Sequence, residues 1–229
     1  MTEDERKEAR KDAEHDALII GGVLALLLGL RKGKHQISWD STTARFKIDG
    51  KIVAIETIRK ELLRIETAQA KKMAGYADAL EAGEITIDEW KDRMRKTVSS
   101  THILMAALAA GSISAVAENT TMERLNKIID SQFIYLSRFA ESIQIAKPSA
   151  PTVKARSKSY LLAAAITFSV IQQIIKVSVG YTEARRIRRA SESCPGCIQF
   201  SYIWLPIEQM PAIGTLQCKW HCRCFLEYR

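Results

Sequence analysis

The sequence predicts a mainly α-helical protein: long antiparallel helices, a small β-hairpin near the N-terminus, and a short cysteine-rich module at the C-terminus that resembles a zinc knuckle. Three observations lead to this prediction. Long segments without proline carry apolar residues at three- and four-residue steps, the period of an amphipathic helix. One short segment alternates between apolar and polar residues, as a strand does. All five cysteines lie within residues 194–229.

The composition is that of a globular protein with a basic surface. The chain has 229 residues, 47% of them hydrophobic, which is enough for a core in one or two domains. Its 34 Lys and Arg exceed its 26 Asp and Glu, so the formal net charge is +8. This balance favours contact with a polyanion such as nucleic acid, although a solvated basic surface has the same composition.

The expected organisation has five parts. They are an N-terminal helix that is first charged and then apolar (1–36), a β-hairpin (37–55), an antiparallel helical bundle (56–147), a long helix (152–190), and the cysteine-rich module (191–229). The turn dipeptide Asp49-Gly50 predicts the hairpin. Thr86 with Glu89 forms a capping-box signature at the start of a bundle helix. The segment 147–151 contains two prolines and breaks the helical pattern.

Residues 17–30 are apolar and carry no charge. Spanning a bilayer takes about 20 apolar residues, so this segment is short for a transmembrane helix. The acidic residues before it argue against a secretory signal, whose first part is basic. We expect a helix buried against protein, in this chain or in a partner, and membrane insertion is the alternative.

The predicted long helix ends in a cluster of four arginines. They are the candidate nucleic-acid-binding residues: Arg185, Arg186, Arg188 and Arg189. Cations suit the negative end of a helix dipole, and guanidinium groups also bind phosphate. A solvated helix face has the same composition, so both interpretations stay open.

The cysteine cluster predicts a structural metal site. Cys194-Pro195-Gly196-Cys197 is one knuckle, and the second lies about twenty residues later. The candidate ligands are Cys194, Cys197, Cys218, His221, Cys222 and Cys224. Thiolate and imidazole ligands suit zinc, which can order a segment too small for its own core. Disulfides and plain reduced thiols are the alternatives. Nucleophilic catalysis is less well supported, because no Asn or Asp beside His221 completes a catalytic set.

Several motifs together resemble a protein family. They are Ala82 to Trp90, Thr101-His102 to Gly111, Tyr135 to Ala140, Ala184-Arg185-Arg186, Cys194-x-x-Cys197 and Cys222-Arg223-Cys224, with a hairpin segment over 39–53. In this order they are similar to the minor head or head-morphogenesis proteins of tailed bacteriophages, including the Mu F-like group. That group ends in His-Pro-x-Cys-Arg-Cys, whereas His221 here directly precedes Cys222, which leaves the ligand role of the histidine open.

The resemblance implies a low-copy virion protein that is made in the host cytoplasm and associates with the portal vertex. We therefore expect a non-enzymatic structural protein acting in head assembly or genome delivery. Its expected partners are the portal or major capsid protein, further copies of itself in a ring, and non-specific double-stranded DNA. The alternatives are a zinc-containing DNA-binding protein acting in the host, and an enzyme, a nuclease or toxin, that uses the cysteine cluster.

Overall fold

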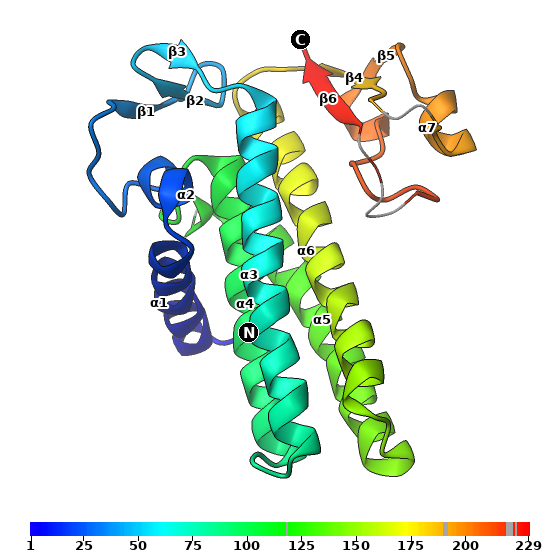
Figure 1. The fold of residues 1–229 in the computed structure, drawn as a ribbon. Coiled ribbons are helices and arrows are strands. Elements are labelled where there is room, and N and C mark those ends of the chain that lie inside the picture. Colours follow the sequence, from blue (N-terminus) through cyan, green and yellow to red (C-terminus); the bar gives the residue numbers. More distant parts are fainter. Residues whose placement is uncertain (118, 190–191, 219–221, 223) are drawn as a thin grey trace.

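The computed structural model describes residues 1–117, 119–189, 192–218, 222 and 224–229. Four long helices form an elongated bundle: α3 (Ile55–Glu81), α4 (Ile87–Ala110), α5 (Asn119–Ala146) and α6 (Ala150–Ser178). Two small sheets lie at the same end of this bundle, one beside the start of α3 and the other beyond the end of α6 (Figure 1). The predicted fold class is therefore confirmed.

The central helix of the bundle is α4. Thr86 caps it, with its hydroxyl accepting from the Glu89 N–H and the Glu89 carboxylate accepting from the Thr86 N–H. Every residue from 97 to 110 is buried. A helix can be buried on all sides only where other helices surround it. α1, α3, α5 and α6 all pack against α4.

The N-terminal segment folds back onto the bundle as two helices, α1 (Glu3–Ile20) and α2 (Gly22–Leu27). Gly21, with a φ of +64°, separates them, so the single helix predicted over 1–36 is wrong. The predicted burial holds at α2, where Leu24 is fully buried and Leu28 nearly so, but it is wrong for Leu18 and Ile19 near the end of α1, which are exposed. Because this core belongs to the same chain, the burial needs no partner.

A buried carboxylate joins α1 to the bundle. Asp16 accepts hydrogen bonds from Gln69 Nε2 at 2.8 Å and Ser100 Oγ at 2.9 Å, and Lys72 Nζ lies 3.1 Å away. A buried charge is tolerated where such partners satisfy it. Asp16 therefore fixes where α1 lies against α3 and α4.

The predicted hairpin is present and is extended to a three-stranded sheet. β1 (Ile37–Asp40), β2 (Arg45–Ile48) and β3 (Lys51–Ile52) are antiparallel, in the order β1-β2-β3. Asp49 and Gly50 turn the chain between β2 and β3, both with positive φ. Trp39 of β1 pairs with Phe46 of β2, and their rings meet edge to face with centroids 4.8 Å apart.

The predicted long helix over 152–190 is wrong after residue 178. α6 ends at Ser178, Gly180 adopts a φ of +93°, and residues 183–187 form strand β4 (Glu183–Ile187). β4 lies between β5 (Trp204–Pro206) and β6 (Phe225–Tyr228). Its partners are distant in sequence, so a local pattern could not reveal them.

The remaining helical segments of the described residues are short: η1 (Ala115–Ala117), α7 (Pro195–Gln199) and η2 (Ile207–Gln209). By length and composition, α6 is the one helix in the described part of the chain that could cross a membrane. Core helices pass the same test. α6 packs against α3, α4 and α5.

Candidate metal centre

The cysteine-rich module is built on the sheet β5-β4-β6 and on α7. In its described residues, half-buried side chains such as Phe200 and Tyr228 pack against a small apolar core of four buried side chains: Ala184, Ile207, Met210 and Leu226. So small a core contributes little stability to a segment of this length. The module therefore depends on further contacts, and its five cysteines supply the most concentrated set.

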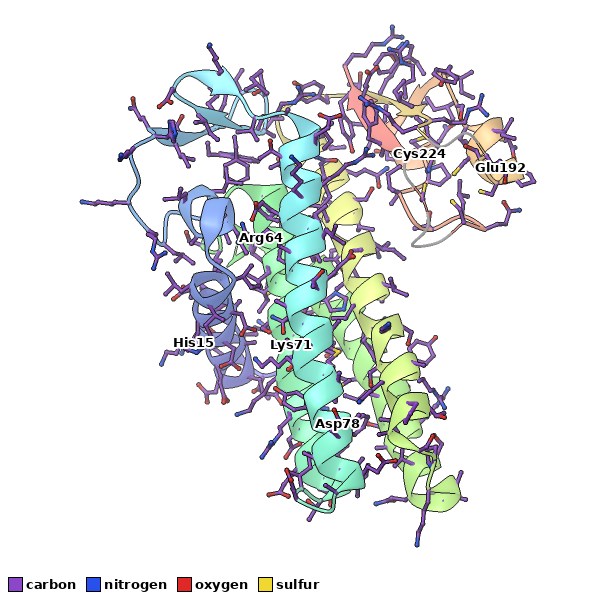
Figure 2. The ribbon with its side chains drawn as sticks, viewed as in Figure 1. His15, Arg64, Lys71, Asp78, Glu192 and Cys224 are labelled. Carbon is purple, nitrogen blue, oxygen red and sulfur yellow. The ribbon has the colours of Figure 1, made fainter. Side chains whose placement is uncertain are left out.

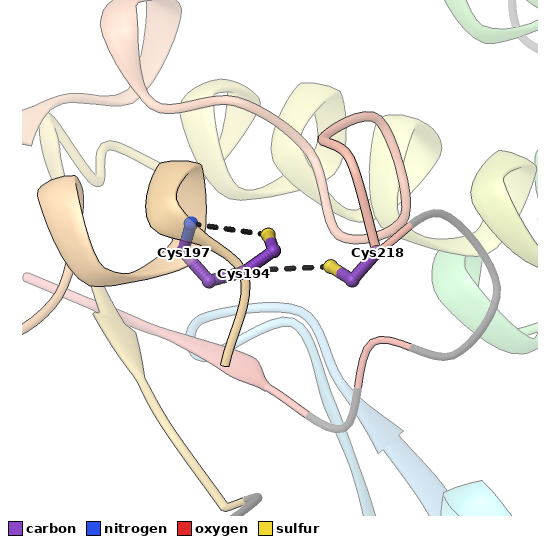
Figure 3. Close-up of side chains that lie close together, drawn as sticks. All are labelled: Cys194, Cys197 and Cys218. Carbon is purple, nitrogen blue, oxygen red and sulfur yellow. Dashed lines mark hydrogen bonds between the residues drawn. The ribbon is translucent and has the colours of Figure 1, made fainter. Parts of the chain in front are cut away.

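The first knuckle is the N-terminus of α7. Cys194 is the N-cap, and its sulfur accepts from the Cys197 N–H at 3.4 Å. Gly196 donates its N–H to Gln217 Oε1 at 3.0 Å, and a Cβ at this position would lie 2.9 Å from the same oxygen. The glycine thus lets the segment before Cys218 approach the knuckle closely (Figure 3).

Five sulfur atoms gather in two overlapping groups. Within each group, all sulfur atoms lie within 4.8 Å of one another. The groups are Cys194, Cys197 and Cys218, and Cys197, Cys222 and Cys224. Cys197 Sγ lies 3.3 Å from Cys218 Sγ and 3.7 Å from Cys222 Sγ. The cysteine cluster can therefore hold a metal ion, with Cys197 common to both groups.

The pKa values of the five thiols are shifted in different directions across the cluster. Burial would raise the pKa of Cys194 and Cys222, but hydrogen bonds, first of all from the backbone N–H groups of Cys197 and Cys224 respectively, outweigh it. The pKa of Cys194 falls to about 7, and that of Cys222 is also lowered. Burial raises the pKa of Cys197, Cys218 and Cys224, that of Cys218 to about 12. A cation bound here would displace the remaining thiol protons.

The sulfur atoms are close enough together to share one metal ion. All five cysteines are free, so the disulfide alternative is not formed in this structure. With metal–sulfur bonds of about 2.3 Å, neighbouring sulfur atoms in a tetrahedral zinc site lie about 3.8 Å apart. The distances of 3.3 and 3.7 Å around Cys197 are close to that value. The sixth candidate ligand, His221, lies outside the described residues.

Arg186 lies at the cysteine cluster and not on the surface. It was predicted to bind nucleic acid, but its side chain is fully buried and its Nη1 faces Cys197 Sγ and Cys222 Sγ. Strand alternation is the reason: Ala184 and Arg186 point inward from β4, whereas Arg185 points outward. If residues 183–187 had been predicted as a strand, its alternation would have placed Arg186 on the same buried face as Ala184.

The four arginines therefore do not form one basic surface. Arg185 hydrogen-bonds Glu227 and lies over the Trp204 ring. Arg189 pairs with Glu56 at 3.1 Å and lies over the Phe225 ring. Arg188 lies over the Tyr202 ring, with its guanidinium 5.6 Å from the ring centroid. The prediction of a shared phosphate-binding set is wrong for Arg186, which is fully buried, and stays a prediction for Arg185, Arg188 and Arg189.

The module is anchored on the end of the bundle. Arg59 of α3 donates to the Cys224 carbonyl at 2.8 Å, and Gln173 of α6 donates to the Met210 carbonyl at 2.7 Å. Cys224 lies on the side of the module that faces the bundle, and Glu192 lies on its outer side (Figure 2). The thiol cluster is thus attached to the helices by polar contacts.

Fold and site together define an α-helical bundle protein with a C-terminal cysteine module able to hold a metal ion. No family model, no curated protein and no solved structure matches the chain.

Proposed function

We propose that this chain is a non-enzymatic minor head protein of a tailed bacteriophage. The observation that supports this most directly is the meeting of three separate motifs of the resemblance. Arg186 of the Ala-Arg-Arg motif, Cys197 of Cys-x-x-Cys and Cys222 of the terminal Cys-Arg-Cys are in mutual contact. Motifs that are 11 to 36 residues apart in sequence thus form one structural unit.

The metal in this proposal is zinc, bound by Cys194, Cys197, Cys218 and Cys222. A single ion that takes ligands from both groups includes Cys197, which they share. Cys222 is the fourth ligand because its sulfur lies 3.7 Å from that of Cys197. Cys224 is one residue further on, and two cysteines separated by one residue are an awkward pair for one tetrahedral ion. When bound, zinc would cross-link the module as a structural ion.

The proposed role is architectural. The long bundle serves as a spacer, and the module at its end serves as a docking element for the portal or capsid protein at the head vertex. Several copies around the vertex would form a ring. Contact with packaged DNA would be electrostatic and non-specific, because the net charge is +8.

The direct test is mass spectrometry of purified phage particles. We expect peptides of this chain in particles purified by density gradient, at an abundance well below that of the major capsid protein. Particles treated with protease before lysis are the control for proteins that adhere to the outside. Absence of the chain from intact particles, together with its presence in the lysate of infected cells, would exclude the proposal.

A further inference from the structure

Arg186 is a fully buried cation. It occupies the middle strand of the C-terminal sheet, on the inward face. Arginine stays protonated in proteins, and a buried charge requires a partner of opposite sign to offset its desolvation. In the described part of the chain, no carboxylate lies within ion-pair distance of Arg186, whereas Arg185 and Arg189 each have one.

Its contacts identify the counter-charge. Nη1 lies 3.6 Å from Cys197 Sγ and 3.7 Å from Cys222 Sγ. Nη2 donates to the carbonyls of Pro211 and Ala212. Carbonyl oxygens carry no net charge, so among these partners only ionised sulfur can balance the guanidinium.

We infer that Arg186 is a positioning residue of the metal centre, an outer-shell cation that hydrogen-bonds two of the thiolates and offsets their charge. The inference rests on the proposed metal site. Four thiolates around a divalent ion leave an excess of negative charge, which a buried guanidinium reduces. The same side chain joins α7, the loop at Pro211 and the segment of Cys222, so it aligns the two halves of the site before an ion arrives.

The test compares metal binding by the full-length chain and three variants. Arg186→Met replaces the charged side chain with an apolar one of similar length. Arg186→Lys keeps the positive charge but lacks the planar guanidinium group with its several N–H donors. Arg185→Met is the matched control, because it removes a neighbouring arginine that faces outward and pairs with Glu227. Zinc affinity is measured by chelator competition, and Co²⁺ replaces zinc to report on the sulfur ligands by absorption.

We expect Arg186→Met to lower zinc affinity about 10- to 100-fold, the range typical of outer-shell partners. Arg186→Lys should lie between this variant and the unchanged chain, and Arg185→Met should stay within about twofold, because it touches none of the ligands. The sulfur-to-Co²⁺ charge-transfer band should move to lower energy in Arg186→Met, since the thiolates lose N–H donors.

Equal affinities and unchanged cobalt spectra in Arg186→Met and Arg185→Met would overturn the inference. If Arg186→Met binds no ion because the module does not form, Arg186→Lys decides. Binding by the lysine variant supports a charge role, and a complete loss in that variant contradicts it. If the unchanged chain binds neither zinc nor Co²⁺, both the proposed metal centre and this inference are wrong. If the chain binds metal equally well with and without Arg186, only the inference about Arg186 is wrong.

Discussion

At the scale of single residues, His102 shows how burial decides the chemistry of a side chain. It is fully buried in α4, and its Nδ1 lies 2.8 Å from Thr167 Oγ1. Burial lowers its pKa from 6.5 to about 3. His102 is a neutral core residue that joins α4 to α6.

Its lowered pKa predicts a pH-dependent stability. The unfolded chain binds a proton at His102 near pH 6.5, but the folded chain does so only near pH 3. The free energy of unfolding therefore falls as the pH is lowered between these values, by about 1.4 kcal/mol from pH 7.5 to 5.5. Urea unfolding of the unchanged chain and His102→Gln at both pH values measures this component.

The component should be missing from His102→Gln, so the variant loses less stability than the unchanged chain on acidification. His15→Gln is the control, because His15 is exposed on α1. The same pH dependence in the unchanged chain and in His102→Gln would contradict the assignment.

At the scale of elements, Gly111 couples the N-terminal sheet to the bundle. It is the C-cap of α4, with a φ of +97°. A Cβ at this position would lie 2.2 Å from the Trp39 ring, closer than any real contact. The β1 strand can therefore pack over the end of α4 only because residue 111 is glycine.

We predict that Gly111→Ala destabilises the protein more than Gly83→Ala does. Both glycines have positive φ, but a Cβ at Gly83 would meet nothing within 4 Å. Gly83→Ala should cost about 1 kcal/mol of unfolding free energy, because it carries only the backbone strain. Overpacking against Trp39 should add about 1–3 kcal/mol at Gly111.

Chemical unfolding of the two variants measures the difference, and tryptophan fluorescence reports whether the environment of Trp39 changes. Trp39→Leu in the Gly111→Ala background should recover part of the loss, because it shortens the clashing side chain. Equal destabilisation by the two alanine variants would show that Trp39 does not pack on Gly111.

At the scale of the whole molecule, bundle and module differ in what holds them together. The bundle has one large continuous core, whereas the described part of the module has a cluster of four buried apolar residues and the sulfur cluster. The module contacts the helices through polar pairs such as Ile213 N–H to Ser169 Oγ at 2.8 Å. Losing the cluster should therefore release the module without unfolding the bundle.

We predict that the purified chain carries about one equivalent of zinc and that a chelator exposes residues 180–229 to trypsin while the helices persist by circular dichroism. Cys197→Ser should have the same effect, because Cys197 belongs to both sulfur groups. Cys224→Ser is the matched control, since it lies outside the proposed ligand set and should retain the metal. A metal-free protein whose module loosens only under a reducing agent would show that disulfides hold it instead.

Local sequence determined the helices of the bundle, the Thr86 cap and the turn at Asp49-Gly50, because caps, turns and helical periods depend on residues within four positions of one another. It also placed the cysteines in two knuckles. The cap of α1 is equally local, because Thr2 and Glu5 form the same capping box as Thr86 and Glu89.

The tertiary structure alone decided where the arginines and the sulfur atoms lie. Residues 183–187 form a strand because residues 204–206 and 225–228 pair with it, and that pairing turns Arg186 inward to the cysteines. The break at Gly21 likewise lets α2 bury Leu24 in a core formed by distant helices. Burial and pairing between distant residues depend on which surfaces meet in space, and no local pattern records that.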